Sequence, residues 1–176
     1  MANREALREL QSRLASRLQA ARTEGMSVAW LALRVGGKNL LFPLGQSGEI
    51  FPLANLQPVP YARDWFRGVI NIRGGLYGVV DLAAFIAGDT GTVRAEPPSQ
   101  DLSVVTLNLA LEVNCALQVD GLLGLRGGDA FASSSPADLG APAYYGNQFI
   151  DSAGEQWQEI DLRILSQTPQ FLSISA

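Results

Sequence analysis

Apolar residues recur with helical spacing at the start of the chain. Over residues 2–22 they form one stripe among arginines and glutamates, comprising Leu7, Leu10, Leu14, Leu18 and Ala21. Steps of three and four residues predict an amphipathic helix, and Gly25 is a stop signal just beyond it. The pattern leaves open whether this helix packs on its own domain or binds a partner. We therefore divide the chain into a helical extension, residues 1–24, and a main domain, residues 25–176, which we expect to fold without the extension.

The pattern changes at residue 28, where short apolar runs begin to alternate with turn residues. The pairs Gly36-Gly37 and Gly74-Gly75 each separate two such runs and indicate hairpins. Strands are predicted over residues 28–35, 40–44, 49–53, 69–72, 76–81, 102–109 and 111–119. Short strands at this spacing, without an alternating strand–helix pattern, favour a mostly β fold such as a barrel or a sandwich.

Two aspartates that follow predicted strands mark the starts of short helices. Asp81 fits a helix N-cap, with that helix ending at Gly88, and a second short helix begins after Asp161. Residues 89–101 hold two adjacent prolines and few apolar side chains, and residues 127–140 are rich in Ser, Gly and Pro. We predict loops for both segments.

The composition is that of a globular chain without a basic surface for nucleic acid. Of 176 residues, 47% are hydrophobic and 17% are charged, and the net charge is −4. The densest basic stretch, over residues 4–22, also holds glutamates, which fits a solvated helix face better than a phosphate contact. No apolar run approaches the roughly 20 residues of a membrane span, and Arg4 and Glu5 do not fit a signal peptide. We expect a cytoplasmic protein that neither binds nucleic acid nor inserts into a membrane.

The inventory of reactive side chains is unusually small. The chain has no histidine, which removes the commonest general base and most zinc sites. Its single lysine, Lys38, lies outside any phosphate-binding loop motif. Alternation along the predicted strand places the single cysteine, Cys115, on the buried face, where a thiol packs as a small apolar group. We expect no cofactor, no metal ion and no catalytic residue.

One tripeptide offers an alternative. Asp89-Thr90-Gly91 matches the sequence that carries the catalytic aspartate of aspartic proteases, and Leu122-Leu123-Gly124 loosely resembles a downstream motif of the dimeric kind. Such enzymes need a rigid loop after an apolar strand, so that two carboxylates can share a proton. Here Asp89 follows a predicted helix end and enters a polar loop. An aspartic protease using Asp89 is therefore the remote alternative.

The segment from Val59 to Leu82, VPYARDWFRGVINIRGGLYGVVDL, carries a more specific pattern. It resembles the signature of the CheW family, adaptor proteins that couple chemoreceptors to the CheA kinase. The residues that fit are Pro60, Trp65, Gly68, Val69, Asn71, Ile72, Arg73, Gly74, Val79, Val80, Asp81 and Leu82. The family often has proline where this chain has Gly78, a departure that affects only a strand end.

Further stretches agree with the family in order. Gly48-Glu49-Ile50 matches an acidic position at the start of a strand, and residues 118–124 resemble the family's L-V-D-x-V-L-G. Residues 146–162 resemble its closing hairpin and helix, so the resemblance covers about residues 28–167. The helical extension and the tail Gln170-Phe171-Leu172 are similar to the branch of the family that serves type IV pili and twitching motility.

The resemblance implies two intertwined five-stranded SH3-like β-barrels with short helices. It also implies a non-catalytic adaptor with two partners, the regulatory domain of a CheA-like histidine kinase and the tip of a methyl-accepting chemoreceptor. The protein would then be recruited to receptor arrays at the membrane. A pathway for type IV pili is favoured, and a flagellar chemotaxis pathway is the alternative.

We predict that the partners bind a face around one set of residues: Ser47, Glu49, Ile50, Leu56, Gly68 and Arg73. Glu49 and Arg73 are charges at strand ends amid apolar neighbours, and we expect them to form an ion pair. At Gly68, the missing side chain would permit close approach by another backbone or helix. The alternative is that these residues simply pack the barrel.

Overall fold

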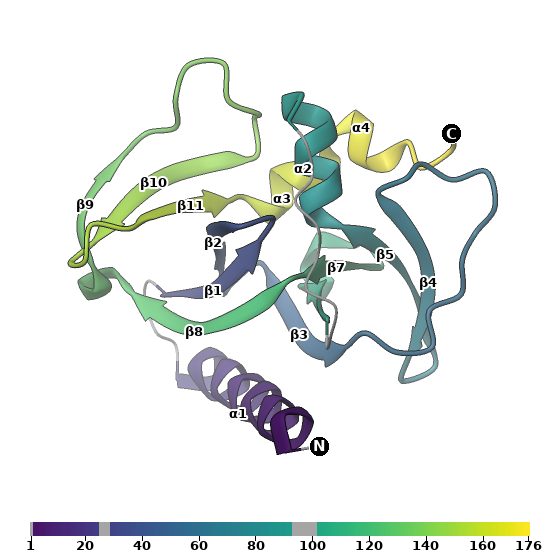
Figure 1. The fold of residues 1–176 in the computed structure, drawn as a ribbon, viewed down its shortest axis with the longest axis horizontal. Helices are drawn as coiled ribbons and strands as arrows, with labels where there is room; N and C mark the ends of the chain where they lie inside the picture. Colours follow the sequence, from purple (N-terminus) through teal and green to yellow (C-terminus); the bar gives the residue numbers. More distant parts are fainter. Residues whose placement is uncertain (1, 25–28, 93–101) are drawn as a thin grey trace.

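The computed structural model describes residues 2–24, 29–92 and 102–176, which fold into two β-sheets with helices around their junction (Figure 1). The strands are β1 (Ala29–Val35), β2 (Lys38–Pro43), β3 (Ser47–Pro52), β4 (Phe66–Ile72), β5 (Gly75–Asp81), β6 (Ser103–Leu107), β7 (Cys115–Val119), β8 (Gly121–Gly127), β9 (Phe131–Ser135), β10 (Tyr145–Asp151) and β11 (Gln156–Ile160). The α-helices are α1 (Ala2–Glu24), α2 (Leu82–Thr90), α3 (Leu162–Gln167) and α4 (Pro169–Leu172). Two 3₁₀ turns, η1 (Leu109–Leu111) and η2 (Gly128–Ala130), complete the set.

The chain builds the two sheets in alternation. One sheet has six strands in the order β8-β1-β2-β11-β10-β9, and the other has five in the order β3-β6-β7-β5-β4. The first two strands start the six-stranded sheet, the next five make the other sheet, and the last four return. Most neighbouring strands are antiparallel, while β5 with β7 and β2 with β11 are parallel. The predicted mostly β fold of two intertwined units is confirmed, with six strands rather than five in one of the two sheets.

A shared core joins the two sheets. The largest buried cluster takes Leu31 and Phe42 from the six-stranded sheet and Val105 and Leu117 from the five-stranded one. Each sheet also encloses a smaller cluster of its own, around Trp30, Ala32, Leu41, Phe149 and Trp157 in one and around Ile70, Val79, Val104 and Ala116 in the other. The molecule is therefore two β units held together by one apolar interior.

Helix α2 is longer than the sequence pattern predicted. Asp81 caps it as expected, with its carboxylate accepting a hydrogen bond from the Ala84 N–H. Gly88 does not end the helix, because Gly91 does so in the left-handed conformation, with φ of 70°. Asp89 consequently lies on the helix rather than in a loop. Most of the predicted loop 89–101 lies outside the described residues.

Two strand assignments also need correction. The predicted loop 127–140 contains β9, which pairs with β10 as an edge strand. The predicted strand 111–119 begins only at Cys115, because Asn108 caps a 3₁₀ turn and Glu112 takes a left-handed conformation. The first difference comes from pairing with a strand further along the chain, and the second from a local cap. A run of apolar residues alone reveals neither.

Helix α1 packs on its own domain, which is one of the two alternatives that the sequence left open. Leu14 and Leu18 are buried in the shared core as predicted, but Leu10 is 43% exposed. Gln11 is buried instead, and its side-chain amide donates a hydrogen bond of 2.5 Å to the Ser103 hydroxyl. The side chain of Ala21 lies outside the described residues. The buried stripe is therefore rotated from the predicted one.

Candidate partner-binding face

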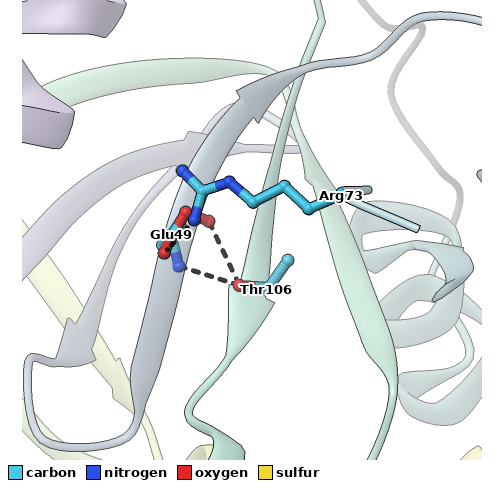
Figure 2. A network of polar contacts seen from close by, with 3 residues as sticks. All are labelled: Glu49, Arg73 and Thr106. Atoms are coloured by element: carbon cyan, nitrogen blue, oxygen red, sulfur yellow. Dashed lines mark hydrogen bonds and ion pairs between the residues drawn. The ribbon is translucent and has the colours of Figure 1, made fainter. Parts of the chain in front are cut away.

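The predicted ion pair between Glu49 and Arg73 is present. Nη1 of Arg73 lies 2.9 Å from Oε1 of Glu49 (Figure 2). Glu49 belongs to β3, and Arg73 occupies the turn after β4 with φ of 50°. Because β3 and β4 are the two edges of the five-stranded sheet, this pair bridges edges that share no described backbone ladder. The side chains are 41% and 72% exposed, so the pair faces solvent.

Neighbouring groups hold this pair in place. The hydroxyl of Thr106 in β6 accepts a hydrogen bond of 2.8 Å from the Glu49 N–H (Figure 2). The guanidinium of Arg73 also lies over the ring of Phe51, 5.6 Å from its centroid, a cation–π arrangement. The backbone of Glu49 and the guanidinium of Arg73 thus each have one further contact beside the ion pair.

A cleft lies beside the ion pair. It encloses about 340 Å³ and is lined by residues that include Glu49, Phe51, Arg73, Tyr77, Thr106 and Leu109. Leu109 in η1 is 79% exposed at this cleft. We call this region the β3–β4 cleft. It combines an apolar wall with a polar border, which is the composition of a protein interface.

The other predicted site residues are less accessible. Ser47 is fully buried and donates its hydroxyl hydrogen to the Pro43 carbonyl, and Ile50 is buried in the shared core. Leu56 is half-buried against the cluster inside the five-stranded sheet. Of the predicted set, Glu49 and Arg73 therefore offer the exposed side chains. Leu109, Phe51 and Thr106 were not in that set; the Asn108 cap is the local signal that could have indicated an exposed Leu109.

Gly68 has a different reason for being glycine than the one predicted. A Cβ atom there would lie 2.1 Å from the carbonyl oxygen of Gln57, and φ is +136°. The N–H and carbonyl groups of Gln57 exchange two hydrogen bonds of 2.9 Å with Val69. The backbone that approaches Gly68 so closely is therefore the chain's own, and Gly68 itself is buried.

The comparisons with known proteins bear on the fold and on this face together. The family profile described as the CheW-like domain matches residues 29–168. The chain belongs to the CheW-like family. That match includes every residue of the predicted face and begins after the end of α1.

Relatives of this CheW-like domain agree with the assignment. The chain is similar to Protein PilI of Pseudomonas aeruginosa, with 29% identity over 114 residues, which cover 65% of this chain and 61% of that protein. The match thus spans less than two thirds of the relative's length. The crystal structure of the scaffolding protein TtCheW from Thermoanaerobacter tengcongensis is similar with a TM-score of 0.64, covering 82% of this chain and 96% of that one. With 16% identity, this likeness shows the shared fold alone.

The chemically suggestive residues of this CheW-like domain have structural partners. Asp89 accepts a hydrogen bond of 2.9 Å from the hydroxyl of Tyr144. The pKa of Tyr144 is raised, mainly by burial of its side chain and secondly by this hydrogen bond. A helical Asp89 bonded to a tyrosine does not fit the paired carboxylates of an aspartic protease. Burial raises the pKa of Cys115 to about 12, so its thiol stays protonated near neutral pH. Among the described residues, no group of three or more metal-ligating side chains occurs.

None of the described helices combines the length and apolarity needed to cross a bilayer.

Proposed function

We propose that this CheW-like domain is a non-catalytic adaptor that couples a methyl-accepting chemoreceptor to a CheA-like histidine kinase. The observation that carries the proposal is the family match over residues 29–168. In this proposal the protein works in the cytoplasm and is recruited to receptor arrays at the membrane. Two partner surfaces on one rigid body would let the state of the receptor reach the kinase.

The similarity to Protein PilI favours a chemosensory system that controls type IV pili. A flagellar chemotaxis pathway would use the same fold and the same two partner types. The two pathways differ in the phenotype of a deletion strain. Loss of twitching with normal swimming would support the pilus pathway, and the converse would replace it with the flagellar one.

We place one partner surface at the β3–β4 cleft. Glu49 and Arg73 supply an ion pair at its border, and Leu109 supplies an exposed apolar group. Ser47, Ile50 and Gly68 contribute by shaping the strands beneath, because their positions are buried. The side chain of Leu56 is half-buried, so its exposure is intermediate between those of the two groups. Charged rims with apolar centres favour rapid and selective protein association.

The test is co-purification of the tagged chain with the kinase regulatory domain and with the cytoplasmic part of the receptor. We expect wild type to retain both. Arg73→Glu and Leu109→Asp should each weaken binding of at least one partner by more than tenfold, without changing the fold measured by circular dichroism. Arg13→Glu is the matched control, since it breaks a second exposed ion pair, with Glu9 in α1. If wild type retains neither partner, the adaptor function is wrong; if both cleft variants bind normally, only the location is wrong.

A further inference from the structure

A pocket lies between helices α2 and α4, on the side of the molecule opposite α1 (Figure 1). It encloses about 800 Å³. Its walls come from the segment that leads into β4, from one face of α2, and from α4 with the tail that follows it. Pockets for small molecules in proteins measure roughly 300–1,000 Å³. We call this region the α2–α4 pocket.

The tail after α4 forms one wall, and the backbone holds it in place. The Arg63 N–H donates a hydrogen bond of 2.8 Å to the Ile174 carbonyl, and the Ala176 N–H donates one of 2.9 Å to the Tyr61 carbonyl. The side chain of Arg63 adds a bond of 3.1 Å from Nε to the Ser173 carbonyl. The wall is therefore tied to the segment that supplies the opposite side of the pocket.

The family match does not account for this wall. The CheW-like profile ends at residue 168, and α4 begins at Pro169. Pro169, Gln170 and Ser173 all line the pocket. The pocket is thus built partly from a segment outside the matched region, so it does not follow from membership of the CheW-like family.

Aromatic rings and small residues shape the interior. Trp65 is half-buried and meets Phe85 edge-on, with ring centroids 5.1 Å apart. On α2, Ala84 and Gly88 lie one turn apart, and a Cβ at Gly88 would meet nothing within 4 Å. Larger side chains at these two positions would occupy the space. The pocket therefore keeps an apolar wall that is open to a ligand.

Two exposed carboxylates at the pocket can accept further hydrogen bonds. Within residues 2–24, 29–92 and 102–176, the carboxylate of Asp64 has neither a hydrogen bond nor an ion pair. One oxygen of Asp89 accepts the bond from Tyr144, which fixes this carboxylate and leaves its other oxygen available. Among the described lining residues, Arg63 is the one cation, and its Nε already donates to Ser173. The lining therefore favours a cation.

We propose that the α2–α4 pocket binds a small organic amine with an apolar body. The ammonium group donates charge-assisted hydrogen bonds to Asp64 and Asp89, and the apolar body lies against Trp65 and Ala84. A carboxylic acid of the same shape meets two like charges and is rejected. The inference goes beyond the proposed function, since it depends on neither the kinase nor the receptor.

The test uses phenethylamine as the probe, with phenethyl alcohol and hydrocinnamate as the neutral and anionic analogues of the same body. Nuclear magnetic resonance of the nitrogen-15-labelled full chain follows the amides of Gly88 and Ser173 and the indole N–H of Trp65. We expect saturable shifts with the amine, with a Kd on the order of 1 mM for so small a ligand. The alcohol should bind at least fivefold more weakly, and hydrocinnamate should not bind.

Substitutions locate the site and its charge preference. Asp64→Asn should weaken amine binding at least threefold and leave binding of the alcohol unchanged. Asp138→Asn is the matched control, because it removes an exposed carboxylate that does not line this pocket. Gly88→Leu should fill the pocket and abolish binding of both the amine and the alcohol. A melting curve establishes that each variant is folded, and Asp64→Asn decides the matter if Gly88→Leu does not fold.

Several outcomes would overturn the proposal. Without saturable binding of the amine, the pocket holds only solvent. Equal affinity for the amine and the alcohol, or tighter binding of hydrocinnamate, would mean that the carboxylates do not select the ligand. A folded Gly88→Leu that binds like wild type, or an Asp64→Asn without effect, would mean that the amine binds elsewhere. None of these results bears on the adaptor function, which the co-purification decides separately.

Discussion

The energetic weight of the Glu49–Arg73 pair follows from its exposure. Both carboxylate and guanidinium face water, so their attraction is screened and fixing two long side chains costs entropy. We predict that a double-mutant cycle with Glu49→Ala and Arg73→Ala gives a coupling free energy below about 1 kcal/mol for unfolding. Urea denaturation of the four chains measures it. A coupling of about 3 kcal/mol or more would be the value of a buried pair and would contradict the solvent exposure.

Gly68 is fixed by its surroundings rather than by a partner. Because a Cβ would collide with the Gln57 carbonyl at a φ of +136°, Gly68→Ala should lower the free energy of unfolding by more than about 2 kcal/mol. Gly88→Ala is the matched control, since a Cβ at that helical position meets nothing within 4 Å. It should raise the free energy of unfolding by up to about 1 kcal/mol. Thermal melts compare the two, and a neutral Gly68→Ala would refute the close approach of the 57–58 backbone.

Gln118 is a buried amide without a partner. It is 1% exposed in β7, and neither of its side-chain polar atoms forms a hydrogen bond with any described residue. The family pattern has leucine at this position. We predict that Gln118→Leu raises the free energy of unfolding by about 1–3 kcal/mol, because it removes an unsatisfied polar group.

Gln11→Leu is the control for that change, because the Gln11 amide is also buried but donates to Ser103. Removing it leaves the Ser103 hydroxyl without this donor, so no gain in stability is expected. Denaturant titration of both variants measures the difference. A loss of stability in Gln118→Leu would indicate a bound water or another polar group at that amide.

At the scale of elements, the sequence predicted the hairpin turns and helix starts that depend on residues close together in the chain. The glycine pairs marked the hairpins, and Asp81 and Asp161 cap helices as their positions indicated. Strand β9 was missed because its serines resemble a loop, and only the ladder with β10, distant in sequence, makes it a strand. The end of α2 was misplaced because Gly88 and Gly91 are equivalent signals until the backbone of one becomes left-handed.

The candidate site divides in the same way. Glu49 and Arg73 could be paired from the sequence because the family pattern places both at strand ends. The reason for Gly68 could not be predicted, since Gln57, which approaches it, comes from a connection with no regular pattern. The buried face of α1 was rotated because Gln11 reads as polar, and its partner Ser103 is distant in sequence.

We expect the main domain to fold without α1, and the burial of the helix gives the expected loss in stability. Leu14 and Leu18 are the two fully buried leucines of the helix. Removing their burial should cost about 3–6 kcal/mol, while both sheets and the rest of the shared core remain. A chain beginning at Gly25 should therefore keep a single cooperative melt at a lower temperature. An insoluble or non-cooperative product would mean that α1 is an integral part of the core and that the domain boundary is wrong.

At the scale of the whole molecule, the shared core determines how the two β units behave. The chain crosses from one sheet to the other and back, so neither unit is a continuous segment. Residues of both sheets, together with residues of α1, α2, α3 and α4, form the largest apolar cluster. Neither sheet can keep its buried face away from water once the other has unfolded. A rigid connection of this kind is what an adaptor with two partner surfaces needs.

This shared interior predicts that the two β units unfold in one transition. Trp30 and Trp157 lie inside the six-stranded unit, so Trp65→Phe leaves a chain whose fluorescence reports on that unit. Trp30→Phe/Trp157→Phe leaves Trp65, which precedes β4 and packs on Phe85 and Phe171 beside the other unit. Within each variant, we expect the denaturant midpoint from tryptophan fluorescence to equal the midpoint from far-ultraviolet circular dichroism. Fluorescence midpoints that separate from the circular dichroism midpoint in opposite directions would mean that the units unfold independently, because the shared cluster would then contribute too little to couple them.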